Sequence, residues 1–348
     1  MSPVPLSILD LSPIATGVTS ARTLRNSLEL ARLADRLGYT RYWFAEHHNM
    51  PMIASTTPAT MIALAAEATT RLRVGAGGLM LPNHAPLQVA ESFKMLEALF
   101  PRRIDLGIGR APGTDPVTAM ALRRTEDTFG TEDDFPEQLA HLLAFDQGNF
   151  PDGHPFRSVR AMPDDVALPP IWLLGSSGYS ARLAAMLGRG FGFAAHFSPE
   201  PPEGPMLAYR HGFRSGGALE QPHAILTVSV ICADTTAEAR GLAASMELTW
   251  AKLRSGRPGK LASPEEALAH PYSPVERAAI EAYRQMQIVG DPPTVKARID
   301  ALVARTRADE VMVTTATHDP AARLRSYELL AREHGLTAPD SAGAPSVS

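Results

Sequence analysis

Eight short apolar runs, separated mostly by amphipathic or alanine-rich stretches, constrain the fold of this chain more than any other feature. Their composition predicts buried strands at residues 4–11, 39–46, 72–81, 102–109, 170–175, 190–197, 223–234 and 308–315. Strands that alternate with helices favour a parallel sheet with right-handed crossovers. Eight is also the number of strands that closes a (β/α)8 barrel. We therefore expect an α/β TIM barrel, with a doubly wound open sheet as the alternative.

The length of 348 residues suits one such barrel with insertions. We expect a single barrel domain over residues 1–335, with insertions near 146–169 and 255–290. The Gly/Pro-rich stretch 255–274 is typical of a mobile loop and is a candidate lid. The Pro/Ser/Ala-rich residues 336–348 are expected to be a disordered tail.

Composition narrows the possible classes of function. The net charge of −4 argues against a nucleic-acid-binding protein, which typically presents a basic face. Cys232 is the sole cysteine, which excludes an internal disulfide and a cysteine-rich zinc site. No apolar run approaches the roughly 20 residues that span a bilayer, and the first residues lack the pattern of a signal peptide. We expect a soluble cytoplasmic protein without nucleic-acid or membrane partners.

Polar side chains gather where the predicted strands end. Because active sites of these barrels lie at the C-terminal strand ends, these residues are candidates for a site. They are Asp10, Glu46, His47, His48, Asn83, His84, Arg110, Ser176, Ser177 and His196.

The stretch "WFAEHHNMP" places a glutamate and two histidines directly after the second strand. Side chains alternate along a strand, so Glu46 and His48 should share one face while His47 takes the other. The two histidines then cannot easily bind one metal ion, and the HExxH spacing is absent. Two interpretations remain: histidines at a loop end that bond the backbone, or a functional imidazole at His47.

Glycines in two further stretches are informative. Gly75, Gly77 and Gly78 indicate either a flat ligand against bare backbone or a β-bulge. The stretch "LGIGRAPG" is one residue too long for a dinucleotide fingerprint, and it follows the fourth strand rather than the first. It leaves Arg110 at a strand end, where a guanidinium suits a phosphate or a surface salt bridge.

The stretch "LLGSSGYSARLAA" runs from a strand into a helix within a few residues. Ser176, Ser177 and Ser180 would then lie beside the free N–H groups of the first helical turn, which is typical of a phosphate site. Ordinary N-capping by serine is the alternative.

Five ordered blocks together resemble one known family. They are "RYWFAEHHNMP", "VGAGGLMLPNHAPLQVAE", "PRRIDLGIGRAPGTDP", "LLGSSGYSARLAA" and "AAHFSPE". The chain is similar to the luciferase-like flavin-dependent monooxygenases, which include bacterial luciferase, and within them to the MsnO8-like subgroup. This resemblance implies a barrel that binds reduced FMN at its C-terminal mouth. It also implies oxygenation of a small organic substrate with O2 through a flavin C4a-(hydro)peroxide.

The resemblance also assigns site residues. His47 takes the position of the catalytic histidine, and Gly77 and Gly78 take that of a non-prolyl cis peptide against the isoalloxazine. The phosphate-binding positions fall on Arg110, Ser176, Ser177 and Ser180, with Tyr179 beside them. Luciferases carry a reactive cysteine where this chain has Gly109, so no thiol chemistry carries over.

The same resemblance implies a separate NAD(P)H:flavin reductase as partner and a homodimer. Two alternatives on this fold are a deazaflavin (F420)-dependent hydride-transfer enzyme and a non-catalytic flavin-binding protein. A metal-dependent hydrolase is a more distant alternative, and we expect no metal site.

Overall fold

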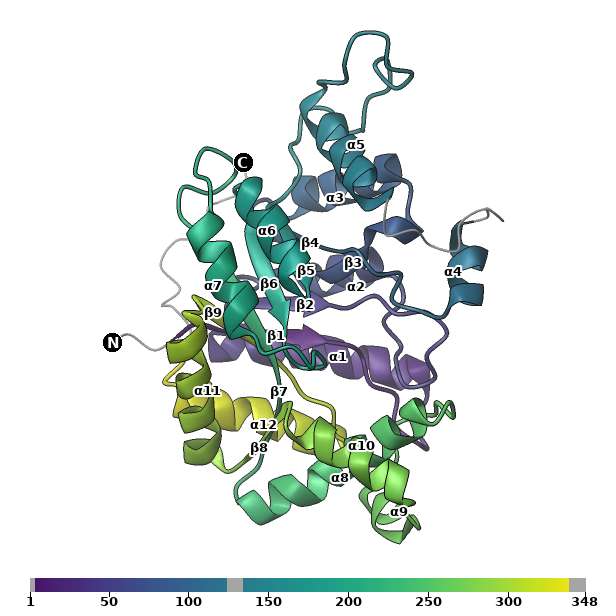
Figure 1. Ribbon diagram of the computed structural model, residues 1–348, viewed down its shortest axis with the longest axis vertical. Helices are drawn as coiled ribbons and strands as arrows, with labels where there is room; N and C mark the ends of the chain where they lie inside the picture. The colour runs from purple at the N-terminus through teal and green to yellow at the C-terminus, as the bar shows by residue number, and fades with distance from the viewer. Residues whose placement is uncertain (1–3, 124–133, 338–348) are drawn as a thin grey trace.

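The computed structural model describes residues 4–123 and 134–337. Within them a parallel barrel of eight strands is closed by pairing of β6 with β7, and helices surround it (Figure 1). The barrel strands are Leu6–Asp10 (β1), Arg41–Phe44 (β2), Arg73–Met80 (β3), Ile104–Gly109 (β4), Ile171–Gly175 (β5), Gly190–Ala194 (β6), Ala224–Cys232 (β7) and Glu310–Thr314 (β9). The predicted TIM barrel is confirmed, and the open sheet is excluded because the pairing of β6 with β7 closes the eight strands into a ring.

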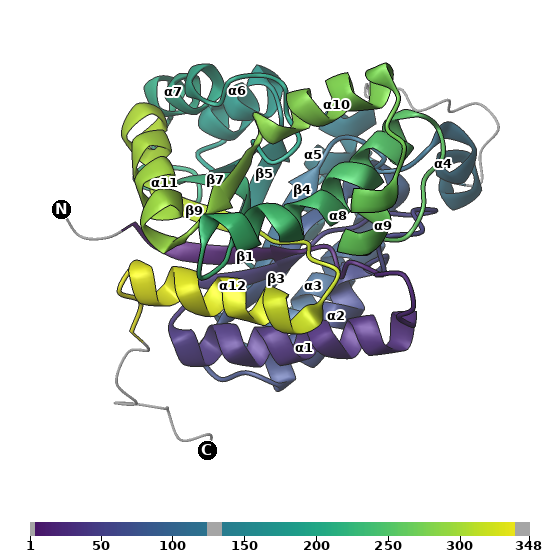
Figure 2. The same ribbon diagram turned by 90° about the horizontal axis from the view of Figure 1, so that it is seen from below.

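The helices follow the strands and cover the outside of the barrel; in Figure 2, α1 and α12 lie side by side below β1. They are Ser20–Leu37 (α1), Pro58–Glu67 (α2), Pro86–Leu99 (α3), Pro116–Arg123 (α4), Phe135–Gln147 (α5), Gly178–Met186 (α6), Glu203–Gly212 (α7), Thr236–Arg254 (α8), Pro264–Ala269 (α9), Pro274–Arg284 (α10), Pro292–Thr306 (α11) and Pro320–Glu333 (α12), with a 3-10 turn at Leu81–Asn83 (η1). Of these described helices, none combines the length and the apolar character needed to cross a bilayer.

Local chemistry explains where α1 begins and ends. The side chain of Thr19 accepts a hydrogen bond from the Arg22 N–H, which satisfies one free donor of the first turn. At the other end Gly38 adopts a left-handed conformation with φ of 85°, as expected for a glycine that ends a helix.

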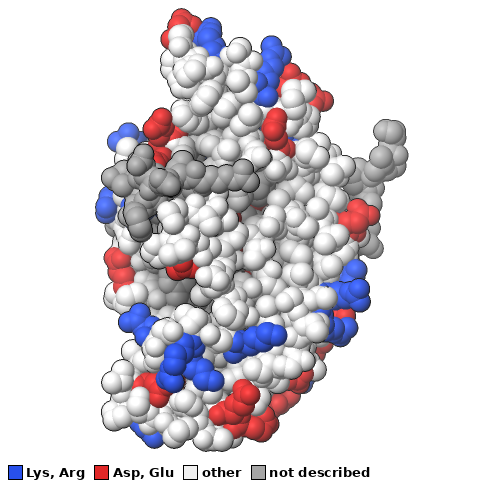
Figure 3. Space-filling model, turned by 90° about the vertical axis from the view of Figure 1, so that its right-hand side faces the viewer, with Lys and Arg blue, Asp and Glu red and all other residues white. Residues whose placement is uncertain are grey.

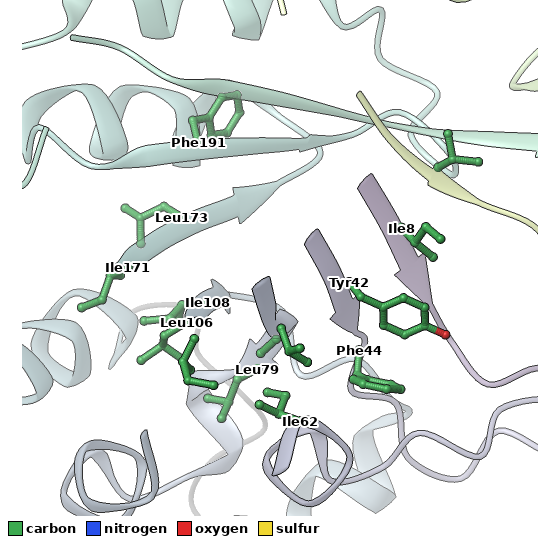
Figure 4. Packing of buried hydrophobic residues seen from close by; sticks show 14 of the residues in the cluster. Ile8, Tyr42, Phe44, Ile62, Leu79, Leu106, Ile108, Ile171, Leu173 and Phe191 are labelled. Carbon is green, nitrogen blue, oxygen red and sulfur yellow. The ribbon is translucent and has the colours of Figure 1, made fainter. Parts of the chain in front are cut away.

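Alternation along the strands divides the apolar side chains into two layers. Outward-facing residues pack against the helices; Figure 4 shows Ile8, Tyr42, Leu106, Leu173 and Phe191 among them. A separate inner cluster fills the barrel itself. It consists of Leu9, Trp43, Ala45, Trp172, Ile225 and Met312.

An ionic network lies beneath this inner cluster. Arg41 donates to Asp105 at 2.9 Å and to Glu310 at 2.7 Å, and all three side chains are buried. Burial opposes ionisation of Glu310, but Arg41 outweighs it and lowers the pKa of the carboxyl to about 2. Arg41 also packs over the ring of Trp172, which joins the network to the inner cluster.

One strand was not predicted. Gln287–Gly290 (β8) pairs with residues 229–232 of β7, beyond the segment of β7 that pairs with β6. It follows α8, α9 and α10, which pack together beside β7 and β8 (Figure 1). Only two residues separate this strand from the end of α10, and neither of them is a Gly or Pro that would mark the end of the helical sequence.

Within residues 255–274, where a mobile loop and candidate lid are expected, the structure contains the helix α9; the mobility of this stretch stays a prediction. Ser263 and Glu266 form a reciprocal capping box that starts α9. Before it, Leu261 is buried and exchanges backbone hydrogen bonds with Ile14 and Thr16. The segment is therefore tied to the loop after β1.

Within the expected insertion near 146–169, residues 149–169 form neither helix nor strand. The tail from residue 338 onward lies outside the described residues. The division into one domain stays a prediction.

Candidate active site

A cavity of about 360 Å³ opens at the C-terminal ends of the barrel strands, and we call it the mouth cavity. It is lined by Leu9, Leu11, Trp43, Ala45, His47, Gly77, Gly78, Met80, Gly109, Arg110, Ala111, Gly113, Leu174, Gly175, Ser176, Ser177, Ser180, Gly192, Ala194, His196, Phe197, Thr227 and Met312. Figure 3 shows this end of the molecule, where charged side chains lie mainly at the margins of a largely uncharged surface. The predicted residues His47, Gly77, Gly78, Arg110, Ser176, Ser177 and Ser180 all line this cavity.

Gly77 and Gly78 form part of the cavity wall and are joined by a cis peptide bond. A Cβ atom on Gly77 would lie 2.8 Å from Leu9 Cδ1 and 2.9 Å from Trp43 Cβ, so packing beneath the cavity requires glycine here. The register between β3 and β4 also shifts between Ala76 and Leu79. The irregular strand is therefore confirmed, whereas a flat ligand against the backbone of Gly77 and Gly78 stays a prediction.

The backbone places His47 just beyond the end of β2. Its N–H donates to the Ser55 carbonyl, and its side-chain Nδ1 lies 3.0 Å from the carbonyl oxygen of Gly113. Because a carbonyl only accepts, Nδ1 carries the proton in the neutral ring and Nε2 is left as an acceptor. Burial holds the pKa of His47 below its usual 6.5, against the opposing effects of Gly113 and Glu46. The imidazole is therefore neutral at pH 7.

Glu46 lies on the other face and makes no hydrogen bond to His47. Its carboxylate is fully buried and accepts from His84 Nε2 and His48 Nε2, each at 2.9 Å, and from the Met80 N–H at 3.0 Å. Burial opposes its ionisation, but these donors hold the pKa of Glu46 below its usual value. The predicted division between His47 and the pair Glu46–His48 is confirmed, and His84 joins that pair.

Arg110 and the start of α6 form a second polar region of the mouth cavity. Ser177 is the N-cap residue of α6 but makes no side-chain capping bond, so the N-capping interpretation is wrong for this residue. The guanidinium of Arg110 lies 4.3 Å from the ring centroid of Tyr179. Tyr179 is not among the described lining residues; it packs against Arg110 instead.

A second cavity of about 290 Å³, the side cavity, shares Leu11, His47, His196 and Phe197 with the mouth cavity. Its other lining residues come from the loops after β1, β2 and β9, from β7 to β9 and from α8, α10 and α12: Pro13, Met50, Met52, Ile53, Ser229, Ile231, Met246, Trp250, Leu253, Tyr283, Gln287, Thr314, Thr315, Ala316 and Arg323. Sequence reasoning missed this cavity, because it is built from elements within and beside the expected insertion at 255–290.

His196 stands between the two cavities. Burial, together with the neighbouring His47, lowers its pKa to about 3, so this imidazole is also neutral at pH 7. Its Nδ1 atom is buried without a hydrogen-bond partner. Across residues 4–123 and 134–337 no group of three or more His, Cys, Asp or Glu side chains is arranged to hold a metal ion.

Comparison with known proteins identifies the family. The profile of the family described as luciferase-like monooxygenase matches residues 4–310. A luciferase-like monooxygenase of Escherichia coli (strain K12) is 43% identical over 326 residues, covering 94% of this chain and 96% of that protein. The N-acetyl-S-alkylcysteine monooxygenase of Bacillus subtilis (strain 168) is 34% identical over 328 residues, covering 93% and 96%.

Among solved structures, that of apo-MsnO8 has a TM-score of 0.87 and 38% sequence identity, covering 96% of this chain and 99% of that one. The similarity extends over almost the full length of each relative. The chain therefore belongs to the luciferase-like monooxygenase family.

Proposed function

We propose that this protein is a flavin-dependent monooxygenase that uses reduced FMN and O2 to oxygenate a small organic substrate. One observation carries the proposal. A single cavity joins the guanidinium of Arg110 and the start of α6, a glycine wall at Gly77 and Gly78, and the neutral imidazole of His47. An apolar cavity adjoins it at that imidazole.

The residues of the mouth cavity fit FMN. The uncapped first turn of α6, the hydroxyls of Ser176 and Ser177 and the guanidinium of Arg110 are the donors that a phosphate needs. A flat ring system suits a wall without side chains, which Gly77 and Gly78 supply. Three inward-facing glycines nearby, Gly109, Gly175 and Gly192, add further bare backbone.

Bound reduced flavin would supply the activation of molecular oxygen, and the protein supplies position and exclusion of water. Arg110 and α6 would anchor one end of the cofactor. His47 offers an unprotonated Nε2 that can accept or return one proton at the boundary of the two cavities. Apolar side chains such as Met52 and Leu253 keep the adjoining space dry.

Cofactor titration tests the proposal. The purified chain is titrated anaerobically with reduced FMN and, separately, with reduced F420, and binding is followed by fluorescence. Arg110→Gln is expected to weaken FMN binding about tenfold or more, since a charge-assisted hydrogen bond contributes about 1.5–3 kcal/mol. Arg240→Gln, an exposed arginine of α8, is the control and leaves binding unchanged. Tight binding of F420 alone would overturn the FMN assignment.

We further propose that a separate NAD(P)H:flavin reductase supplies the reduced FMN and that the protein is a homodimer. Leu64 of α2 and Met95 and Leu99 of α3 support the dimer, because these large apolar side chains are exposed on two helices that contact each other. Size-exclusion chromatography with light scattering measures the molar mass of the assembly. Leu99→Glu is expected to give a monomer.

A further inference from the structure

We infer that the side cavity selects an uncharged, mainly apolar substrate and holds its one neutral polar group, such as an amide or a carbonyl, through the side-chain amide of Gln287. This inference rests on the proposed function only in treating the bound molecule as the substrate. The binding itself is a property of the side cavity and can be measured without turnover.

The walls of the side cavity are mostly apolar. Met52, Met246, Trp250 and Leu253 line it, and the ring of Trp250 stacks on that of Tyr283. Methionine side chains adapt to ligands of irregular shape, and aromatic rings supply broad apolar contact. A ligand that occupies this space must therefore be apolar over most of its surface.

Gln287 is the exception within these walls. It pairs in register with Ser229 in a parallel sheet, so both side chains leave the sheet on the same face, toward the cavity they line. Its side chain is only 2% exposed, and neither the amide oxygen nor the amide nitrogen makes a hydrogen bond. The hydroxyl of Tyr283 lies close to the side chains of Ser229 and Gln287, but it does not reach hydrogen-bond geometry with either polar atom of the Gln287 amide.

A buried amide with no partner costs free energy unless a ligand satisfies it. Its oxygen accepts one hydrogen bond and its nitrogen donates two, so the group matches a ligand that both donates and accepts. A primary or secondary amide satisfies both atoms of Gln287 at once, and a ketone or ester satisfies one.

The charges on the walls of the side cavity determine that its preferred ligand is uncharged. Arg323 is the charged residue among the described lining residues, and it is committed to Asp10 at 2.7 Å and to the Thr315 carbonyl at 2.8 Å. The two imidazoles on the boundary, His47 and His196, are neutral at pH 7. An ionic ligand would lose its hydration here without gaining an opposite charge, which disfavours carboxylates and amines.

Three probes of equal chain length test whether the side cavity prefers an uncharged ligand. Hexanamide, hexanoate and hexylammonium are titrated into the purified full-length chain at pH 8, and binding is measured by calorimetry and by saturation-transfer NMR. Hexanamide is expected to bind at least tenfold more tightly than either ion. Equal binding of the three probes, or tighter binding of an ion, would overturn the inference.

Two variants connect the preference to Gln287. Gln287→Met keeps the volume of the side chain and is expected to weaken hexanamide binding about tenfold, or about 1.4 kcal/mol. The variant should also melt at a higher temperature, because it removes an unsatisfied amide. Gln287→Glu is expected to shift the preference toward hexylammonium. The matched control is Gln285→Met, two residues earlier, where the side chain is exposed and lies outside the side cavity.

The outcomes separate this inference from the proposed function. If hexanamide binds as described while no substrate is oxygenated, the cavity assignment stands and the monooxygenase proposal fails. If oxygenation occurs while Gln287→Met binds hexanamide as the unaltered protein does, Gln287 has no role in recognition and the inference fails.

Discussion

The Nδ1 atom of His47 lies 3.0 Å from the carbonyl oxygen of Gly113, and this contact fixes which ring nitrogen carries the proton. Gly113 belongs to the loop after β4, whereas His47 follows β2. Two neighbouring loops thus hold one imidazole at the boundary of the mouth cavity and the side cavity. The tautomer leaves Nε2 as the only ring atom able to accept a proton.

Replacing His47 should uncouple oxygen use from substrate oxidation. In His47→Ala the proton acceptor is lost, so product formation should fall by about 10²-fold or more while a larger share of reduced FMN ends as hydrogen peroxide. Product and peroxide per flavin oxidised are the measurements, and FMN affinity should change little. His48→Gln is the control, since His48 bonds Glu46 and lines neither cavity. Unchanged coupling in His47→Ala would remove the proposed role.

Replacing Glu46 should destabilise the loops around the site. The Glu46 carboxylate accepts hydrogen bonds from the Met80 N–H, from His48 and from His84. In Glu46→Gln an amide NH₂ group replaces one carboxylate oxygen, so at least one of these donors faces another donor. The expected loss is about 2–3 kcal/mol in the free energy of unfolding, measured by urea denaturation. Glu67→Gln, on the exposed side of α2, should change that value by less than about 0.5 kcal/mol. Equal stability of the two variants would show that the Glu46 bonds contribute little.

Adding one methyl group at Gly77 should cost stability. The new Cβ atom would approach both Leu9 and Trp43 to less than 3.0 Å, so Gly77→Ala should lower the free energy of unfolding by about 1–3 kcal/mol. A matched Gly204→Ala in α7 meets no atom within 4 Å and should be neutral or slightly stabilising. Chemical denaturation of both variants measures the difference. Equal stability of the two variants would mean that Leu9 and Trp43 of the inner cluster can move to accommodate the added methyl group.

Most of the barrel and much of the site could be predicted from the sequence because their signals are local. Apolar runs and helix ends are read from neighbouring residues, and alternation alone separated His47 from Glu46 and His48. Contacts across the chain were not predictable in this way. His84 reaches Glu46 from the turn after β3, and Gln287 reaches the side cavity from β8. Only the closed barrel brings these residues together.

Acid should destabilise the protein through its buried neutral histidines. In the folded state the pKa of His196 is lowered to about 3, against 6.5 in the unfolded chain, so below pH 6.5 the unfolded state binds a proton that the folded state does not. Stability therefore falls as pH falls through 6.5, and His47 contributes in the same direction. Glu46 and Glu310 have lowered pKa values in the folded state. The stabilisation that their ionised forms contribute begins to be lost only below about pH 4.5.

Between pH 6.5 and pH 5.0 the change in stability therefore reports the titration of the histidines. Urea denaturation at both pH values should show that the unaltered protein loses about 1.5 kcal/mol more than His196→Asn, which lacks the titrating group. His211→Asn, an exposed histidine of α7, is the control and should follow the unaltered protein. If His196→Asn loses as much stability as the unaltered protein over this interval, His196 takes up its proton equally in both states. The buried, neutral ring assigned to the boundary of the two cavities would then be wrong.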